Sequence, residues 1–121
     1  MTVWGKIGAM IQVTSLDKDI WSIAPQGRID SAGARSIEEA FANLFEQGAA
    51  RFVVDFSEVT YMASAGLRVL MISLKRAKQG DGDVRLAALN PRVKETLRMS
   101  GLDTLFAFHD TVAEAVQNLK A

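Results

Sequence analysis

The chain contains no cysteine, only two prolines and a single histidine among its 121 residues. The absence of cysteine excludes disulfides, thiolate zinc sites, iron–sulfur clusters and cysteine nucleophiles. No zinc-protease motif, phosphate-binding loop, dinucleotide fingerprint or calcium loop is present. The sequence therefore predicts neither a bound metal nor a cofactor.

The chain also lacks an excess of charge and a long apolar run. Fourteen Lys and Arg residues balance fourteen Asp and Glu residues, so electrostatics favours neither nucleic acid nor an anionic membrane as a partner. The longest apolar stretch, residues 67–74, contains Arg68 and Ser73 and falls far short of the ~20 apolar residues that a spanning helix needs. No signal-peptide core follows the N-terminus. We expect one cytoplasmic domain over residues 1–121, with the place of residues 1–9 left open.

The first 30 residues predict a β-hairpin. Two β-forming segments, residues 10–16 and 20–29, flank a polar turn. Pro25 and Gly27 lie within the second segment. They indicate an edge position or a β-bulge, because proline cannot donate a ladder hydrogen bond.

After the hairpin, amphipathic helical segments alternate with short β-forming runs. Asp30 and Ser31 precede the first helical segment as capping candidates, and Asn90 and Thr111 precede the last two. This alternation predicts an α/β fold with a mixed, mostly parallel central sheet of about four or five strands and about four helices. The expected helices cover about residues 33–47, 65–79, 91–100 and 112–119, and the expected strands cover 51–56, 84–89 and 105–108.

The second helix divides into an apolar and a basic side by residue spacing. We expect its apolar stripe to lie in the core. The basic side could pair with an acidic partner, but a solvated face is favoured for its more distal residues, whereas Arg68, one turn from Ser64, borders the surface that contains this serine. The apolar stripe comprises Leu67, Leu70, Met71 and Leu74, widened by Val69 and Ile72, and the basic residues are Arg68, Lys75, Arg76 and Lys78.

Residues 57–66 form the expected loop between the buried strand 51–56 and the second helix. In parallel sheets, partners and ligands meet such loops. Ser64 is predicted to cap the helix that begins at about Ala65, with its hydroxyl accepting a backbone N–H near Leu67. A phosphate on Ser64 would lie at the positive end of the helix dipole, and its charge of about −1.5 to −2 would change any docking surface. From the residues alone, a plain capping serine is the alternative.

The segment from Asp55 to Leu67, DFSEVTYMASAGL, resembles the signature of STAS domains, the sulfate-transporter and anti-sigma-factor-antagonist domains. Two further motifs resemble the family pattern in the right order. Residues 27–30, GRID, are similar to its G-x-[IL]-D, and residues 90–102 are similar to its proline-initiated helix that ends in Gly-Leu. Together the motifs cover about residues 10–120, so the resemblance implies the STAS fold.

The stand-alone bacterial members that the chain resembles are anti-sigma factor antagonists. The resemblance implies binding to an ATP-binding serine-kinase anti-sigma factor, and thereby regulation of transcription. It also implies inactivation by phosphorylation of Ser64, with a phosphatase restoring the active form. Asp30 matches the family's acidic residue beside the phosphosite. The chain departs from the family at Ala63, where an acidic residue is usual, so one negative charge is missing next to Ser64.

The resemblance implies a docking surface around this serine, and a homodimer is compatible with it. The expected docking residues are Asp30, Ser31, Thr60, Met62, Ala63, Ser64, Ala65, Gly66 and Arg68.

Two other functions stay open at this stage. A non-switching STAS subunit of a transport system, such as a lipid-transport ABC complex, would not require an acidic residue at position 63. A Ser–His–Asp hydrolase would use Ser64 and His109. However, residues 62–66 lack the first glycine of the nucleophile-elbow motif, and His109 at a strand end fits a capping or solvated histidine better. The sequence therefore favours a regulatory protein without enzymatic activity.

Overall fold

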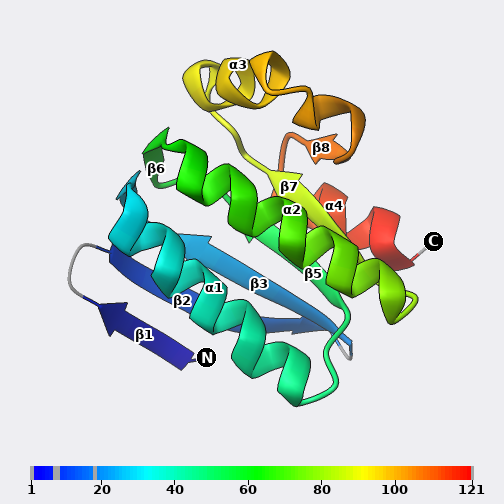
Figure 1. Ribbon diagram of the computed structural model, residues 1–121. Coiled ribbons are helices and arrows are strands. Elements are labelled where there is room, and N and C mark those ends of the chain that lie inside the picture. Colours follow the sequence, from blue (N-terminus) through cyan, green and yellow to red (C-terminus); the bar gives the residue numbers. More distant parts are fainter. Residues whose placement is uncertain (1, 7–8, 18, 121) are drawn as a thin grey trace.

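Figure 1 shows the computed structural model of the protein, which describes residues 2–6, 9–17 and 19–120. A mixed β-sheet runs through the molecule and is covered by helices on both faces. The strands are β1 (Thr2–Lys6), β2 (Ala9–Asp17), β3 (Ile20–Pro25), β4 (Gly27–Ile29), β5 (Arg51–Asp55), β6 (Val59–Met62), β7 (Asp83–Ala87) and β8 (Phe108–His109).

Within the described residues, the main sheet has six strands in the order β1-β2-β3-β5-β7-β8, and β4 and β6 form a separate two-stranded sheet. The pairs β1–β2 and β2–β3 are antiparallel, whereas β3–β5, β5–β7 and β7–β8 are parallel. The predicted α/β class, the N-terminal hairpin and the parallel pairing after it are confirmed. Strand β1, which pairs with β2, was not predicted, and the turn residue Lys18 lies outside the described residues.

The helices form two layers around the main sheet. Helices α1 (Ser31–Glu46) and α2 (Ser64–Gln79) lie side by side across one face, and α4 (Val112–Lys120) packs on the other. Helix α3 (Pro91–Met99) and the 3₁₀ turn η1 (Leu102–Thr104) contact each other, and α3 also contacts β6. None of the helices in the described part of the chain combines the length and apolar character that crossing a lipid bilayer requires.

Strand β5 is buried on both faces, which explains why its sequence is a continuous apolar run. Phe52 and Val54 belong to the core beneath α1 and α2, whereas Val53 packs against the α4 side. The Phe52 ring lies edge-on to the rings of Phe41 and Phe45, with centroids 5.0 Å apart in both pairs. These aromatic contacts hold the C-terminal half of α1 against β5.

The strand predicted over residues 20–29 is two strands that belong to different sheets. Strand β3 ends at Pro25, and Gly27, with φ of 81°, turns the chain into β4, which pairs with β6. Of the two predicted alternatives, the edge position does not hold for β3, which lies between β2 and β5, whereas β4, which contains Gly27, pairs with β6 alone. Pro25 is tolerated because β3 pairs with β5 only from Ile20 to Ile23. The predicted irregularity is confirmed as a register shift between Gly27 and Arg28.

The apolar stripe of α2 is narrower than predicted. Met71 and Ile72 are 47% and 52% exposed, so their expected place in the core is wrong. Leu67, Leu70 and Leu74 are buried as expected. The sheet and α1 cover only one side of α2, and Met71 follows Ser64 by two helical turns, which places both on the solvent side.

Gly82 provides a stability test of the turn that leads from α2 into β7. A Cβ at Gly82 would lie 1.8 Å from the Ala50 carbonyl oxygen, which accepts a hydrogen bond from the Asp83 N–H at 3.0 Å. We expect Gly82→Ala to lower the free energy of unfolding by about 2–3 kcal/mol, measured by urea denaturation. Gly80→Ala is the matched control, because its Cβ would meet nothing closer than 3.7 Å. Equal stability of the two variants would contradict the close approach.

Candidate functional site

Two helix N-termini lie next to each other at the end of the small β4–β6 sheet. Helix α1 follows β4 and α2 follows β6. The two strands pair in parallel with Ile29 opposite Met62, and the Ala63 N–H donates to the Ile29 carbonyl oxygen at 2.9 Å. Because parallel strands end at the same edge of a sheet, this pairing brings Asp30 and Ser64 to neighbouring positions.

Asp30 caps α1, as the sequence predicts. Its extended backbone precedes the helix, and its Oδ1 accepts a hydrogen bond from the Gly33 N–H at 2.9 Å. The carboxylate therefore satisfies one of the free N–H groups of the first turn and faces the positive end of α1. Asp30 remains exposed while it does so. The predicted helix start at about residue 33 lies two residues too late, because α1 begins at Ser31.

Ser64 does not cap α2, so this prediction is wrong. The N-cap is Ala63, with φ of −83° and ψ of 168°, and Ser64 is the first residue of the helix. The physical reason is the strand before it. The Ala63 N–H continues the β4–β6 pairing by bonding to Ile29, while the Ala63 carbonyl oxygen accepts from the Gly66 N–H at 2.9 Å. The extended N-cap conformation consequently falls on a residue whose side chain has no acceptor.

The Ser64 hydroxyl is left free by this arrangement. Its side chain is exposed, and its hydroxyl makes no hydrogen bond with any residue in the described ranges. The expected loop 57–66 also differs from the prediction, because it contains strand β6. Ser64 thus lies at the strand-to-helix junction, at the positive end of α2.

Met62 and Gly66 form the buried side of this junction. The Met62 side chain is 2% exposed, and a Cβ at Gly66 would lie 3.0 Å from both Ile29 Cγ2 and Met62 Cγ. The small Gly66 therefore lets α2 approach β4 and β6 closely. Of the residues expected to form the docking surface, Asp30, Ser31, Thr60, Ser64 and Arg68 are exposed, Ala63 and Ala65 are half-buried, and Met62 and Gly66 are buried.

Sequence reasoning did not single out Arg28 and Tyr61, which shape this edge, and it predicted Asn90 only as a helix cap. The Arg28 guanidinium lies 4.4 Å above the centre of the Tyr61 ring, across the β4–β6 pair. Asn90 caps α3 by accepting from the Val93 N–H at 2.8 Å, and its Nδ2 donates to the Val59 carbonyl oxygen at 2.9 Å. Asn90 therefore ties α3 to β6. Arg28 and Tyr61 lie inside two of the recognised motifs, which was the available signal for both.

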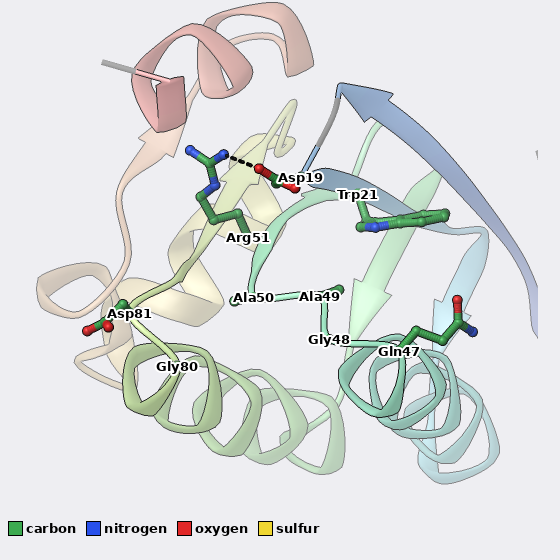
Figure 2. Close-up of a pocket in the computed structure, with 9 residues that line it drawn as sticks. All are labelled: Asp19, Trp21, Gln47, Gly48, Ala49, Ala50, Arg51, Gly80 and Asp81. Atoms are coloured by element: carbon green, nitrogen blue, oxygen red, sulfur yellow. Dashed lines mark hydrogen bonds and ion pairs between the residues drawn. The ribbon is translucent and has the colours of Figure 1, made fainter.

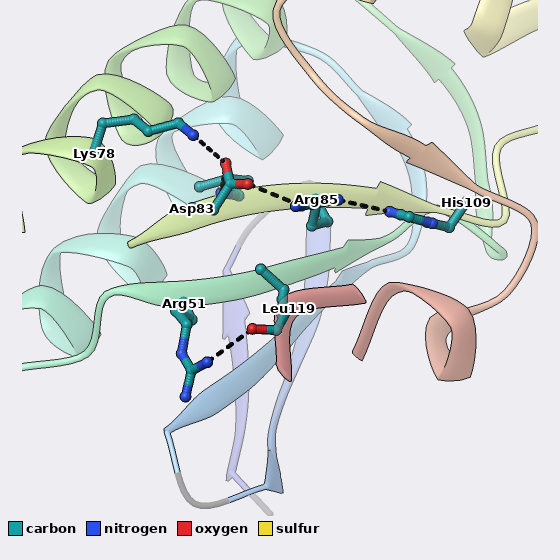
Figure 3. Close-up of polar contacts among 7 residues, drawn as sticks. Arg51, Lys78, Asp83, Arg85, His109 and Leu119 are labelled. Atoms are coloured by element: carbon teal, nitrogen blue, oxygen red, sulfur yellow. Dashed lines mark hydrogen bonds and ion pairs between the residues drawn. The ribbon is translucent and has the colours of Figure 1, made fainter. Parts of the chain in front are cut away.

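His109 is engaged away from Ser64. Figure 3 shows its ring beside Arg85, with His109 Nε2 3.3 Å from Arg85 Nη1. Arg85 Nε also donates to Asp83 Oδ2 at 2.8 Å, and Lys78 Nζ lies 3.3 Å from Asp83 Oδ1. No hydrogen bond joins His109 to Ser64 within the part of the chain that the structure describes. The geometry gives no support to the hydrolase alternative, which needs this ring nitrogen to accept the serine proton.

A hollow of about 420 Å³ lies at the other end of the two long helices. Figure 2 shows Trp21, Arg51 and Asp81 among the residues around it, with Arg51 Nη2 3.5 Å from a carboxylate oxygen of Asp19. The hollow adjoins the C-terminal ends of α1 and α2, about 24 Å from Ser64 by the length of α2. This hollow is therefore separate from the serine site. Among the described residues, no group of three or more acidic residues or histidines is placed to hold a metal ion.

Comparison with known proteins agrees with this architecture. The family model described as the STAS domain matches residues 12–115. The chain belongs to the STAS domain family. Among curated relatives of this STAS domain is BtrV of Bordetella bronchiseptica, named as an anti-sigma factor antagonist, with 36% identity over 81 residues that span 67% of this chain and 70% of BtrV. An anti-sigma-B factor antagonist of Staphylococcus aureus is 25% identical over 95 residues, which cover 78% of this chain and 87% of that protein.

Solved structures share the fold of this STAS domain. An anti-sigma factor antagonist from Mycobacterium paratuberculosis aligns with a TM-score of 0.85 and 22% identity, over 94% of this chain and 96% of that one. The anti-sigma factor antagonist SpoIIAA in its unphosphorylated form aligns with a TM-score of 0.82 and 18% identity, over 91% and 96% of the two chains. At these identities the likeness shows the fold alone.

The uncapped start of α2 can be tested by adding an acceptor. We expect Ala63→Asp to raise the free energy of unfolding by about 1 kcal/mol, because its carboxylate would accept a first-turn N–H and face the positive end of the helix. We expect Asp30→Ala to lower it by about 1 kcal/mol, because α1 loses the bond to Gly33. Urea denaturation at neutral pH measures both changes.

Ser64→Ala is the control for this test. The hydroxyl makes no hydrogen bond with the described residues, so we expect a change within about 0.5 kcal/mol. A loss of about 1 kcal/mol in Ser64→Ala, together with no gain in Ala63→Asp, would mean that Ser64 is the true cap.

Proposed function

We propose that this STAS domain is an anti-sigma factor antagonist that binds an ATP-binding serine-kinase anti-sigma factor and is switched off by phosphorylation of Ser64. A phosphatase would restore the unmodified form, and the cycle would operate in the cytoplasm, where transcription takes place. The observation that carries the proposal is the free, exposed Ser64 hydroxyl at the N-terminus of α2. Because the fold does not use this hydroxyl, a modifying enzyme can reach it without breaking a contact among the described residues.

The relatives support the regulatory part of the proposal. BtrV and the Staphylococcus aureus protein are both named as antagonists of anti-sigma factors, and SpoIIAA has been solved in a phosphorylated as well as an unphosphorylated form. No comparable support exists among these relatives for the transport-subunit alternative. The fold cannot discriminate the two, because a sulfate transporter family protein from Wolinella succinogenes aligns with a TM-score of 0.76 at 13% identity.

The local electrostatics explains how the fold would tolerate the phosphate. Phosphoserine at position 64 would stand at the positive end of α2, and Arg68 follows one turn later on the same side of the helix. The fold therefore stabilises the added charge of about −1.5 to −2. A partner seated on the same exposed edge would meet that charge directly, so we expect modification to weaken binding while leaving the domain folded.

Ala63 changes the surroundings of the serine without removing it. The side chain is a methyl group where the family usually has a carboxylate, so the charge next to Ser64 is less negative. Asp30, on the neighbouring helix end, remains as an acidic group of the proposed docking surface. We expect the kinase of this protein to recognise Ser64 without a carboxylate at position 63.

Capture of partners from the source cell by tagged variants tests the switch. We expect wild type and Ser64→Ala to retain a kinase-like anti-sigma factor and Ser64→Asp to lose most of it, because a negative charge at position 64 repels the docked partner. Mass spectrometry identifies the captured protein. The purified kinase with ATP should then phosphorylate wild type at Ser64 and leave Ser64→Ala unmodified.

Ser15→Asp is the matched control, because it adds the same charge at an exposed position near the far end of β2. It should capture the kinase as well as wild type does. Retention of one transporter ATPase by all of these baits, with Ser64 unmodified in the cell, would replace the switch by a constitutive transport subunit.

A further inference from the structure

Helix α2 carries a concentration of positive charge that the balanced net charge of the chain conceals. It contains Arg68, Lys75, Arg76 and Lys78 and no acidic residue. Four of the fourteen basic residues therefore lie on one helix, and the rest of the chain has ten basic against fourteen acidic residues. The exposed side of α2 is consequently basic while the remainder of the protein is net acidic.

Two of these four cations already have partners within the fold. Lys78 Nζ lies 3.3 Å from Asp83 Oδ1, and the Arg76 guanidinium lies 4.5 Å above the centre of the Phe45 ring. Arg68 and Lys75 are exposed and form no ion pair with any residue that the structure describes. Their charges are therefore available to another molecule.

The two free cations flank an exposed apolar pair. Ser64, Arg68, Met71 and Lys75 follow one another at intervals of four, three and four residues, which places them on one stripe of the helix. Met71 is 47% exposed, and Ile72 beside it is 52% exposed. We call Arg68, Met71, Ile72 and Lys75 the α2 stripe. It begins one turn after Ser64, so it continues the surface that contains the serine.

A hollow of about 370 Å³ borders the α2 stripe at Ile72. It lies between α1 and α2, and Phe41 and Phe45 contribute to its lining. Glu38 and Glu39 line it from the α1 side, so the positive charge is confined to the α2 side. An apolar side chain of a partner can therefore pack over Met71 and Ile72 and extend toward the hollow.

We infer that the α2 stripe binds an acidic protein surface whose carboxylates pair with Arg68 and Lys75 and whose apolar side chain covers Met71 and Ile72. This inference rests on the proposed function, because the acidic surface belongs to the anti-sigma factor that docks at Ser64. Charge complementarity decides the occupant: a basic face on a net-neutral protein attracts an acidic partner and repels a basic one. A membrane surface fits less well, because an interfacial helix needs a large exposed apolar face, and the leucines of α2 are buried.

Binding of the purified kinase to charge-reversed variants tests the inference. We expect Arg68→Glu and Lys75→Glu each to raise the dissociation constant about fivefold to tenfold, mainly by slowing association. The effect should be smaller at high salt. Met71→Ala should act mainly by speeding dissociation, because it removes apolar contact. Surface plasmon resonance at two salt concentrations measures both rates.

Lys120→Glu is the matched control, because it reverses an exposed charge on α4, on the opposite face of the sheet, and disturbs only its surface ion pair with Asp17. It should bind as wild type does. A complex that forms with wild type and is unchanged by Arg68→Glu and Lys75→Glu overturns the acidic-partner inference and leaves the switch at Ser64 intact. Absence of any kinase complex with wild type overturns the proposed function and this inference with it.

Sedimentation with lipid vesicles tests whether the α2 stripe binds a membrane surface instead of a protein. Vesicles of equal parts phosphatidylglycerol and phosphatidylcholine should not sediment the wild-type protein. Co-sedimentation that is lost in the Arg68→Glu, Lys75→Glu double variant would assign the α2 stripe to a membrane surface instead, and would overturn the inference of a protein partner.

Discussion

The parallel pairing of β4 with β6 is the constraint on which the candidate site depends. These two short strands stand apart from the main sheet, and each leads directly into a long helix. Pairing Ile29 with Met62 therefore places the positive ends of α1 and α2 at one edge of the molecule. Asp30 and Ser64 belong to separate β–α units of the chain, so this pairing is what brings them close together.

The same pairing leaves the Ser64 hydroxyl without a hydrogen bond. The last backbone hydrogen bond of the β4–β6 pair, from the Ala63 N–H to the Ile29 carbonyl oxygen, holds Ala63 in the extended conformation that precedes α2. The Asp30 carboxylate caps α1, but the N-cap of α2 is Ala63, whose methyl side chain cannot accept a hydrogen bond. The protein thus has one helix end stabilised by a carboxylate and a neighbouring one that is not. The serine hydroxyl is free at the unsatisfied end, which is the physical basis of the proposed switch.

Charge is distributed along α2 in a way that links the serine to a wider surface. Arg76 and Lys78 are used within the fold, near the C-terminal end of the helix. Arg68 and Lys75 are not, and they flank exposed Met71. A partner that binds this face would also cover Ser64, so phosphorylation of Ser64 would weaken binding to the whole α2 stripe. Under the proposed switch, phosphorylation of Ser64 would make this surface less positive while the fold stayed the same.

Local spacing, cap chemistry and contiguous motifs are enough to predict the α/β class and the family from the sequence, and they narrow the cap of α1 to Asp30 or Ser31. The tertiary structure alone shows that residues 20–29 split between two sheets, since Gly27 redirects the chain toward β6, which begins 32 residues later in the sequence. It also decided that Ala63 rather than Ser64 precedes α2, because a hydrogen bond to Ile29 sets that boundary. Exposure of Met71 was likewise beyond reach of periodicity, which shows which residues share a helix face but not how much of that face the neighbouring elements cover.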